Sequence, residues 1–338
     1  MPNARLPFPP MEAELVREIP DGDGWQYEPK WDGFRGVLEN LDGELNLWSR
    51  NERPLLRYFP ELRGLGSMLP PSSALDGEIV IERHGALEFD VLQMRLHPAE
   101  SRINRLAGEI PARFVAFDVL FWAGVPLHEL LLDERRARLD QLPLDRSPAS
   151  RDRSVALDWH ERLEAAGFDG IVAKRLDQAY LPGSRDGVVK IKRHRTAECV
   201  VVGVRWSEPG VVATLLLGLY DEGGELHHVG SAAASAASKR AEIEARVVPL
   251  LFGEPSTEPI GPPNRWQSQK KALAWSRARP EAVVEVRFDK WQGMRFRHGT
   301  RLMRFRPDKK PDDCTIGQVI LRPRAGDPTV DSLLSANS

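Results

Sequence analysis

In the first part of the chain, short runs of alternating apolar and polar residues predict β-strands. Three such runs cover residues 25–29, 33–40 and 44–50. The pair Asp42-Gly43 lies between the last two runs, and an Asp-Gly pair in this position indicates a tight hairpin turn. We therefore expect antiparallel pairing in this region.

Longer apolar runs and amphipathic stretches extend this first domain. Residues 75–82 and 113–122 are rich in Val, Ile and Phe, which is typical of buried strands. Helical spacing of apolar residues predicts helices at 54–68, 127–142 and 156–166, and further strands are expected at 169–175 and 187–193. The mixture predicts an α+β domain with antiparallel sheets over residues 1–193.

The pattern changes near residue 194. Stretches at 199–206, 214–220 and 225–231 have the form of a three-strand meander, and a helix at 238–251 and strand-like segments at 281–289 and 294–306 follow. Several short strands with one interposed helix are typical of a small Greek-key barrel of the OB type. We expect an OB domain over 194–324. Residues 325–338 have few apolar groups to bury, and a mobile C-terminal tail is expected there.

The composition limits the classes of protein to consider. Of 338 residues, 41% are hydrophobic and 28% are charged, which is ordinary for a soluble protein. No apolar run approaches the roughly 20 residues of a membrane span, and the N-terminus lacks the apolar core of a signal peptide. We expect a cytoplasmic protein without membrane contact. The two cysteines, Cys199 and Cys314, are too few for a disulfide framework or a zinc site.

Charge is unevenly distributed along the chain. Residues 1–192 contain 25 basic and 32 acidic side chains, whereas residues 193–338 contain 22 and 17. Within 265–310 there are 14 basic and 4 acidic side chains. Binding to phosphates depends on a local basic surface rather than on the whole-chain charge. The second half could therefore contact nucleic acid, although a solvated cationic face would have the same composition.

The segment from Glu28 to Arg35 has the clearest chemistry. It reads Glu28-Pro-Lys30-Trp-Asp32-Gly33-Phe-Arg35. A lysine is a poor nucleophile at neutral pH unless burial or cationic neighbours lower its pKa. A nearby glycine permits close approach of the backbone to a phosphate or base. Taken alone, the same pattern also fits a strand and turn at the surface.

This segment resembles the adenylated-lysine motif, Lys-x-Asp-Gly-x-Arg, of the covalent nucleotidyltransferases, the superfamily of DNA ligases, RNA ligases and mRNA capping enzymes. The other motifs of that superfamily follow in its order, at Ser49-Arg50-Asn51, Asp76-Gly77-Glu78, Phe117-Asp118, 169–174, 189–192 and 304–309. Runs such as QYEPKWDGFRG, KIKRHRTAECVV and RFRPDKKPDDCT most resemble the bacterial ATP-dependent DNA ligase C family. The resemblance covers residues 25–310 and implies an adenylation domain followed by an OB domain.

The resemblance also implies a reaction. It is the sealing of 5′-phosphate/3′-hydroxyl nicks in duplex DNA, through lysyl-AMP and DNA-adenylate, in DNA repair. Lys30 would attack the α-phosphorus of ATP, with Lys190, Lys192 and Asp32 as further catalytic residues; Lys190 and Lys192 would lower the pKa of Lys30. The residues implied for ATP or AMP are Glu28, Lys30, Arg35, Arg50, Glu78, Phe117, Lys190 and Lys192, with Arg304, Arg306, Asp308 and Lys309 on the OB domain.

A divalent cation and DNA complete the implied set of ligands. Asp169 and Glu78 would hold Mg²⁺ or Mn²⁺, because hard cations take oxygen ligands. The family commonly has Glu where this chain has Asp169, so a shorter carboxylate must lie closer to the ion. DNA would contact Arg50, Lys174, Lys270 and Lys271. Residues 253–279 combine basic and aromatic groups suited to a DNA backbone, or form a surface loop anchored by tryptophans.

Three other functions fit parts of the sequence. An RNA ligase shares the lysine, but several RNA ligases lack an OB domain with the last motif. An mRNA capping guanylyltransferase shares both domains and uses GTP, and Glu28 favours adenine only modestly. A DNA-binding scaffold built on an inactive ligase would not need the lysines. We expect a monomer in the bacterial cytoplasm, at the nucleoid when on DNA, with repair partners that the sequence does not identify.

Overall fold

The computed structural model describes residues 6–234, 237–258 and 273–335. Two compact units make up the chain. The first unit comprises Met1–Arg193 and Leu321–Ser338, and the second comprises His194–Ile320. Lys270 and Lys271 lie outside the described residues. None of the described helices is long and apolar enough to span a bilayer.

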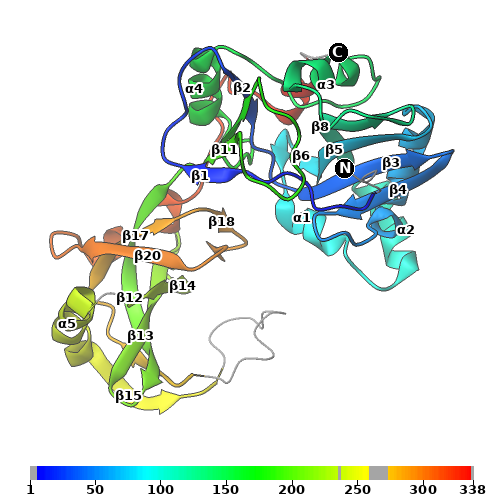
Figure 1. Cartoon of the computed structure of the whole chain (residues 1–338). Helices are drawn as coiled ribbons and strands as arrows, with labels where there is room; N and C mark the ends of the chain where they lie inside the picture. The colour runs from blue at the N-terminus through cyan, green and yellow to red at the C-terminus, as the bar shows by residue number, and fades with distance from the viewer. Residues whose placement is uncertain (1–5, 235–236, 259–272, 336–338) are drawn as a thin grey trace. The chain divides into compact units, whose positions relative to one another are not determined.

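The larger sheet of the first unit has five antiparallel strands (Figure 1). Their order is β4 (Glu44–Ser49), β3 (Phe34–Leu41), β5 (Ser73–Val80), β8 (Arg113–Trp122) and β9 (Val125–Pro126). The predicted hairpin is confirmed, because β3 and β4 pair through Leu41 and Glu44 around the turn. Asp42 and Gly43 both have positive φ, as a tight hairpin turn requires.

A second sheet of four strands carries other parts of the motifs. Its order is β1 (Glu14–Val16), β11 (Val188–Ile191), β10 (Ile171–Arg175) and β2 (Trp25–Pro29). The strands are antiparallel except for the parallel pair β1 and β11. The short strands β6 (Glu82–Arg83) and β7 (Ala86–Leu87) form a separate hairpin. The α+β class with antiparallel sheets is therefore confirmed.

The described part of the first 193 residues, 6–193, contains four α-helices. They are α1 (Phe89–Met94), α2 (Glu100–Glu109), α3 (Leu132–Leu139), which contacts β8, and α4 (Arg153–Arg162), which contacts β2. The helix expected at 54–68 is instead two short 3₁₀ helices, η1 (Leu56–Tyr58) and η2 (Pro60–Ser67). Pro60 cannot continue an α-helix, and Gly64 and Gly66 weaken one.

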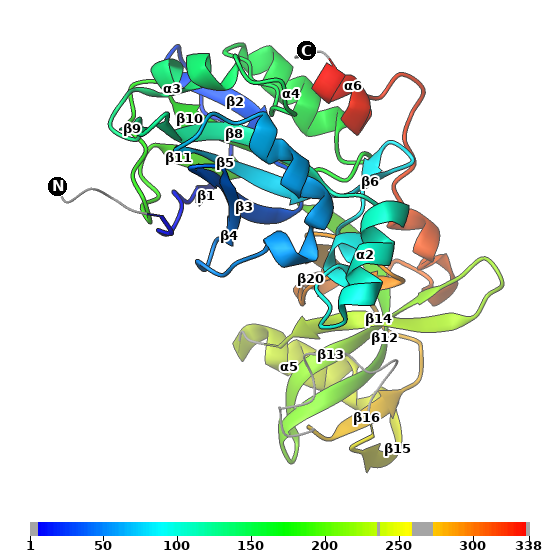
Figure 2. The ribbon, with the colours of Figure 1, turned by 90° about the vertical axis from the view of Figure 1, so that its right-hand side faces the viewer.

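The C-terminal stretch contradicts the expectation of a mobile tail over 325–338. It contains α6 (Val330–Ser335), which lies beside α4 in Figure 2. The side chains of Val330, Leu333 and Leu334 are buried in a cluster that also includes Trp31 and Phe168. These partners are distant in sequence, which is why the local composition does not predict the packing.

The second unit is a barrel. Its sheet has the order β13 (Val211–Tyr220), β14 (Leu226–Ala233), β20 (Thr300–Phe305), β17 (Val283–Phe288), β12 (Arg195–Glu208), β16 (Trp275–Ala278) and β15 (Leu251–Ser256), and an extra pairing between β12 and β13 closes it. One helix, α5 (Ala237–Arg246), follows β14. The predicted meander is therefore present, and the OB-type fold is confirmed.

Candidate active site

A cavity in the first unit receives side chains from strands of both sheets. Its lining comes from β2, β3, β5, β8, β10 and β11 and from residues 10–13. Seven of the residues predicted to bind the nucleotide contribute to it: Glu28, Lys30, Arg35, Arg50, Glu78, Phe117 and Lys190. Motif residues as far apart in sequence as Glu28 and Lys190, 162 positions, thus meet at one site. Asp32 is nearly buried and lies outside the lining.

Lys30 is fixed by backbone hydrogen bonds to the loop before β10. Its N–H donates to the carbonyl of Gly170 at 2.9 Å, and its own carbonyl accepts from Asp169 at 2.9 Å. Gly170 cannot be replaced easily, because a Cβ there would lie 2.0 Å from the carbonyl oxygen of Ile191. The ammonium of Lys30 lies 3.0 Å from an Asp169 carboxylate oxygen, which also contacts Lys192 at 2.9 Å.

The pKa of Lys30 differs from the expectation. Burial acts to lower it, but the carboxylates of Asp169 and Glu78 outweigh burial, and the pKa lies above its usual value. Lys190, in contrast, has a lowered pKa because of burial and the neighbouring charges of Lys30 and Lys192. In the protein alone, Lys30 therefore holds its proton, and its neighbouring lysines do not compensate for the two carboxylates.

Glu78 lies close to the turn that follows Lys30. One of its carboxylate oxygens accepts a hydrogen bond from the Gly33 N–H at 3.1 Å. A Cβ at Gly33 would lie 2.1 Å from the carbonyl oxygen of Ile79, so this close approach needs glycine. Burial raises the pKa of Glu78 to about 7, against the opposing charges of Lys30 and Arg35.

Arg35 is held by partners that the motif pattern does not reveal. Its guanidinium makes two hydrogen bonds of 2.5 Å to Asp76, donates to the Met11 carbonyl at 3.0 Å, and lies 4.6 Å from the Phe117 ring centre. Tyr180 donates its hydroxyl proton to Asp76 at 2.6 Å and accepts from the Met11 N–H at 2.9 Å. Neither Met11 nor Tyr180 lies in one of the sequence motifs, so the motif pattern does not identify them as part of the site.

Lys174, expected from the sequence to contact DNA, has a buried side chain that lines the cavity. It is 8% exposed, pairs with Glu28 at 2.7 Å and donates to the Phe117 carbonyl at 3.1 Å. Its ammonium also lies 4.7 Å from the Phe117 ring centre. Gln26 donates to the same Glu28 oxygen at 2.9 Å. The strand alternation of β10 turns Lys174 inward, toward Glu28 on the neighbouring strand β2.

A buried ion pair supports the strand that carries Phe117. Arg135 of α3 contacts both carboxylate oxygens of Asp118, at 2.7 and 3.0 Å, and donates to the carbonyls of Leu130 and Gln178. The charge of Arg135 lowers the pKa of Asp118 despite burial. The pair is fully hydrogen-bonded, which makes its burial tolerable.

The last motif lies in the second unit. Arg306 forms a two-bond fork with Asp308, at 2.9 and 2.7 Å, and contacts Glu198 at 2.6 Å. The hydrogen bonds from Arg306 hold the pKa of Asp308 at about 2. Arg304 contacts Glu285 at 2.6 Å, and the exposed Lys309 follows in the same turn. These residues form one charged surface at the end of β20.

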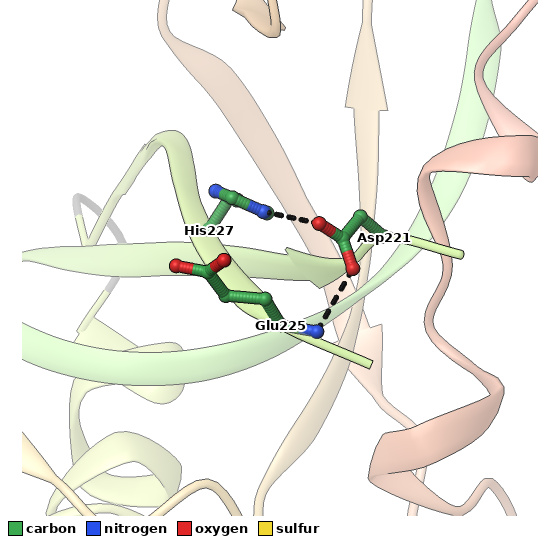
Figure 3. A group of neighbouring side chains, drawn as sticks. All are labelled: Asp221, Glu225 and His227. Atoms are coloured by element: carbon green, nitrogen blue, oxygen red, sulfur yellow. Dashed lines mark hydrogen bonds and ion pairs between the residues drawn. The ribbon is translucent and has the colours of Figure 1, made fainter. Parts of the chain in front are cut away.

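One further group of ionisable side chains lies at the turn between β13 and β14. Asp221, Glu225 and His227 place ligand atoms within 4.8 Å of one another (Figure 3). Asp221 contacts His227 at 2.8 Å, and its other oxygen accepts from the N–H groups of Gly223 and Glu225 at 2.9 Å. These bonds stabilise the turn and account for the position of Asp221.

Comparison with protein families covers both units. Residues 10–192 match the ATP dependent DNA ligase domain, and residues 208–309 match the ATP dependent DNA ligase C terminal region. The first match includes the whole cavity lining, and the second includes Arg304, Arg306, Asp308 and Lys309. Both units of the chain are therefore similar to parts of one kind of protein.

Individual relatives agree with the family match. DNA ligase C1 of Mycolicibacterium smegmatis is 40% identical over 93% of this chain and 94% of the relative. DNA ligase C of Mycobacterium tuberculosis is 38% identical over 93% of this chain and 94% of the relative. Among solved structures, the ligase domain of M. tuberculosis LigD aligns with a TM-score of 0.50 and 26% identity, over 91% of this chain and 98% of that domain.

Proposed function

The chain belongs to the family of ATP-dependent DNA ligases, and we propose that it seals 5′-phosphate/3′-hydroxyl nicks through an AMP carried on Lys30. In the first step the Lys30 amine attacks the α-phosphorus of ATP, a phosphoramidate forms and pyrophosphate leaves. In the second step AMP passes to the 5′-phosphate of the nick. In the third step the 3′-hydroxyl attacks that phosphate, the phosphodiester bond forms and AMP leaves.

The observation that carries this proposal is the position of Lys30. Its backbone is pinned to Gly170 at 2.9 Å, and its ammonium lies in a cavity lined by the other predicted nucleotide residues. A fixed nucleophile reduces the entropic part of the barrier, because only the substrate must be oriented. Phe117 supplies a ring for the adenine, and Glu78 supplies a carboxylate for the ribose hydroxyl.

Lys30 must lose a proton before it attacks. Asp169 and Glu78 oppose this loss, and they are also the two predicted ligands of Mg²⁺ or Mn²⁺. Both carboxylates act on the same ammonium group, which supports the proposal that their hard oxygens share one cation. When bound, such an ion offsets phosphate charge and the charge of the two carboxylates. Lys190 on the cavity wall would neutralise the α-phosphate.

We assign Arg304, Arg306, Asp308 and Lys309 to the adenylation step. Their guanidinium and ammonium groups suit the β- and γ-phosphates of ATP, and the carboxylate of Asp308 orients Arg306. Motion of the OB domain toward and away from the nucleotide would separate adenylation from sealing. Alanine substitution of Arg304 and Lys309 should slow self-adenylation and spare sealing of pre-adenylated DNA. Equal losses in both steps would contradict this division.

The test of the main proposal is incubation with radiolabelled ATP or GTP and Mg²⁺, followed by a denaturing gel. A labelled band from ATP alone should form with the wild type and with Lys239→Ala, a lysine of α5 in the second unit. The band should be lost in Lys30→Ala. A band from GTP instead would assign the chain to the capping enzymes, and a band retained in Lys30→Ala would exclude Lys30 as the nucleophile.

We propose nicked duplex DNA as the substrate and DNA repair as the setting. Sealing of a nicked duplex should exceed sealing of the same junction in RNA strands, which separates the DNA ligase from the RNA ligase alternative. We also propose a cytoplasmic location and a monomeric state, and sedimentation of the purified protein tests the monomeric state directly.

A further inference from the structure

The segment before β1 is anchored to the cavity at several points. The N–H of Glu12 donates to the Ser184 carbonyl at 2.7 Å. Its neighbour Met11 accepts from Arg35 at 3.0 Å and donates to the Tyr180 hydroxyl at 2.9 Å. Residues 11 and 12 are therefore fixed relative to the nucleotide-facing side chains.

The carboxylate of Glu12 bridges two arginines. One oxygen lies 2.8 Å from Arg50, and the other lies 2.9 Å from both Nε and Nη2 of Arg185. The Arg50 and Arg185 side chains are 64% and 66% exposed, whereas that of Glu12 is 25% exposed. The hydrogen bond from Arg185 and the charge of Arg50 lower the pKa of Glu12, so the bridge is ionic at neutral pH.

The Glu12 bridge lies between the nucleotide cavity and an adjoining surface hollow. Glu12 and Arg50 line the nucleotide cavity and also an adjoining hollow. Arg185 and Asn51 line the adjoining hollow only. Any phosphate that occupies the adjoining hollow would lie next to the site where AMP is carried.

We propose that Glu12 is a positioning residue, which holds Arg50 and Arg185 together so that their remaining N–H groups grip one terminal phosphate beside the nucleotide. This inference rests on the proposed ligase function. A guanidinium has five N–H donors, and the bridge uses one of Arg50 and two of Arg185. Two long, exposed side chains would otherwise lose rotamer freedom when the phosphate binds, and the bridge removes part of that cost beforehand.

The terminal phosphate has two possible sources, the 5′-phosphate of the nick and the phosphate tail of ATP. Separate steps distinguish them. Self-adenylation is measured against ATP concentration with the free enzyme, and AMP transfer to nicked DNA is measured in a single turnover with the adenylated enzyme. A loss confined to transfer identifies the nick phosphate, and a loss confined to adenylation, with a raised KM for ATP, identifies the tail of ATP.

The variant to compare is Glu12→Gln, which keeps the shape of the side chain and removes its charge. We expect a loss of about tenfold in one of the two steps. Glu14→Gln, which removes an exposed charge two residues further along, is the matched control and should resemble the wild type. Arg185→Ala should give a similar loss, and the double variant with Glu12→Gln should lose little more, because the two residues act as a unit.

A binding measurement separates positioning from a purely structural role. The adenylated wild type should bind a nick with a 5′-phosphate more tightly than one with a 5′-hydroxyl. If the nick supplies the phosphate, Glu12→Gln should lose most of that preference and still bind the 5′-hydroxyl nick. If self-adenylation or AMP transfer is faster in Glu12→Gln than in the wild type, the carboxylate competes with the phosphate. If both rates are unchanged, the bridge is an ordinary surface ion pair. Either result overturns the proposal.

Discussion

Glu78→Gln provides a quantitative test of the electrostatics of the cavity. Glu78 has a pKa of about 7, mainly because its carboxylate is buried. Lys30 and Arg35 oppose this rise, and Asp32 and Asp76 add to it. Glutamine has nearly the same shape and can still accept the hydrogen bond from Gly33, but it cannot ionise.

The expected effect follows from the two pKa values of the carboxyl group. The ordinary value is 4.5 and the folded value is about 7, and this difference corresponds to roughly 3 kcal/mol at most. Below pH 4.5 both folded and unfolded chains hold the proton, and there is no cost. Between pH 4.5 and 7 the carboxyl group is ionised in the unfolded chain and protonated in the folded chain. Folding then takes up a proton, and the free energy of folding becomes less favourable as the pH rises. Glu78→Gln should therefore gain up to ~3 kcal/mol over the wild type at pH 8 and only about 1 kcal/mol at pH 5.

Urea unfolding at pH 5, 6, 7 and 8 measures this difference. The transition of interest is that of the first unit, because a chain with two compact units need not unfold in one step. Glu44→Gln, an exposed position on β4, is the control and should show no trend with pH. The reasoning fails if Glu78→Gln is no more stable than the wild type at pH 8, or if its advantage is the same at every pH. Self-adenylation should fall in this variant, because the ribose loses its carboxylate partner.

Three other substitutions have expected outcomes. Gly33→Ala should destabilise the first unit by at least ~2 kcal/mol, because its Cβ would lie 2.1 Å from the Ile79 carbonyl; an unchanged melting temperature would contradict this. Arg135→Leu should cost about 3–5 kcal/mol in urea unfolding, because it leaves Asp118 buried without its partner, and replacing Asp118 by Leu as well should recover part of the loss. Leu334→Ala should cost about 2–3 kcal/mol if α6 is docked as described, whereas a tail in solvent would show no effect.

Features set by neighbouring residues could be predicted from the sequence. The β3–β4 hairpin follows from Asp42-Gly43 between alternating runs, and the barrel strands follow from their apolar stretches. The helix expected at 54–68 was wrong because the apolar spacing was given more weight than Pro60 and the glycines after it.

Features set by distant partners could not be predicted in the same way. The ordered motifs predicted which residues meet in the cavity, but not that Lys174 turns inward to pair with Glu28. The raised pKa of Lys30 depends on the distance of 3.0 Å to Asp169, which a motif does not specify. The role of Glu12 depends on Arg185, which lies 173 residues away.

The position of α6 has a consequence for how the protein is made. The first unit is interrupted in sequence by the whole second unit, since His194–Ile320 lies between Arg193 and Leu321. The cluster behind Trp31 and Phe168, the residues next to Lys30 and Asp169, is completed only by Val330 and its neighbours. During synthesis, therefore, the hydrophobic core of the nucleotide-binding unit can be completed only after the ribosome has made the whole barrel. A fusion or truncation at the C-terminus should therefore lower the stability of the unit that carries the nucleophilic lysine, although the barrel is closer to the C-terminus in sequence.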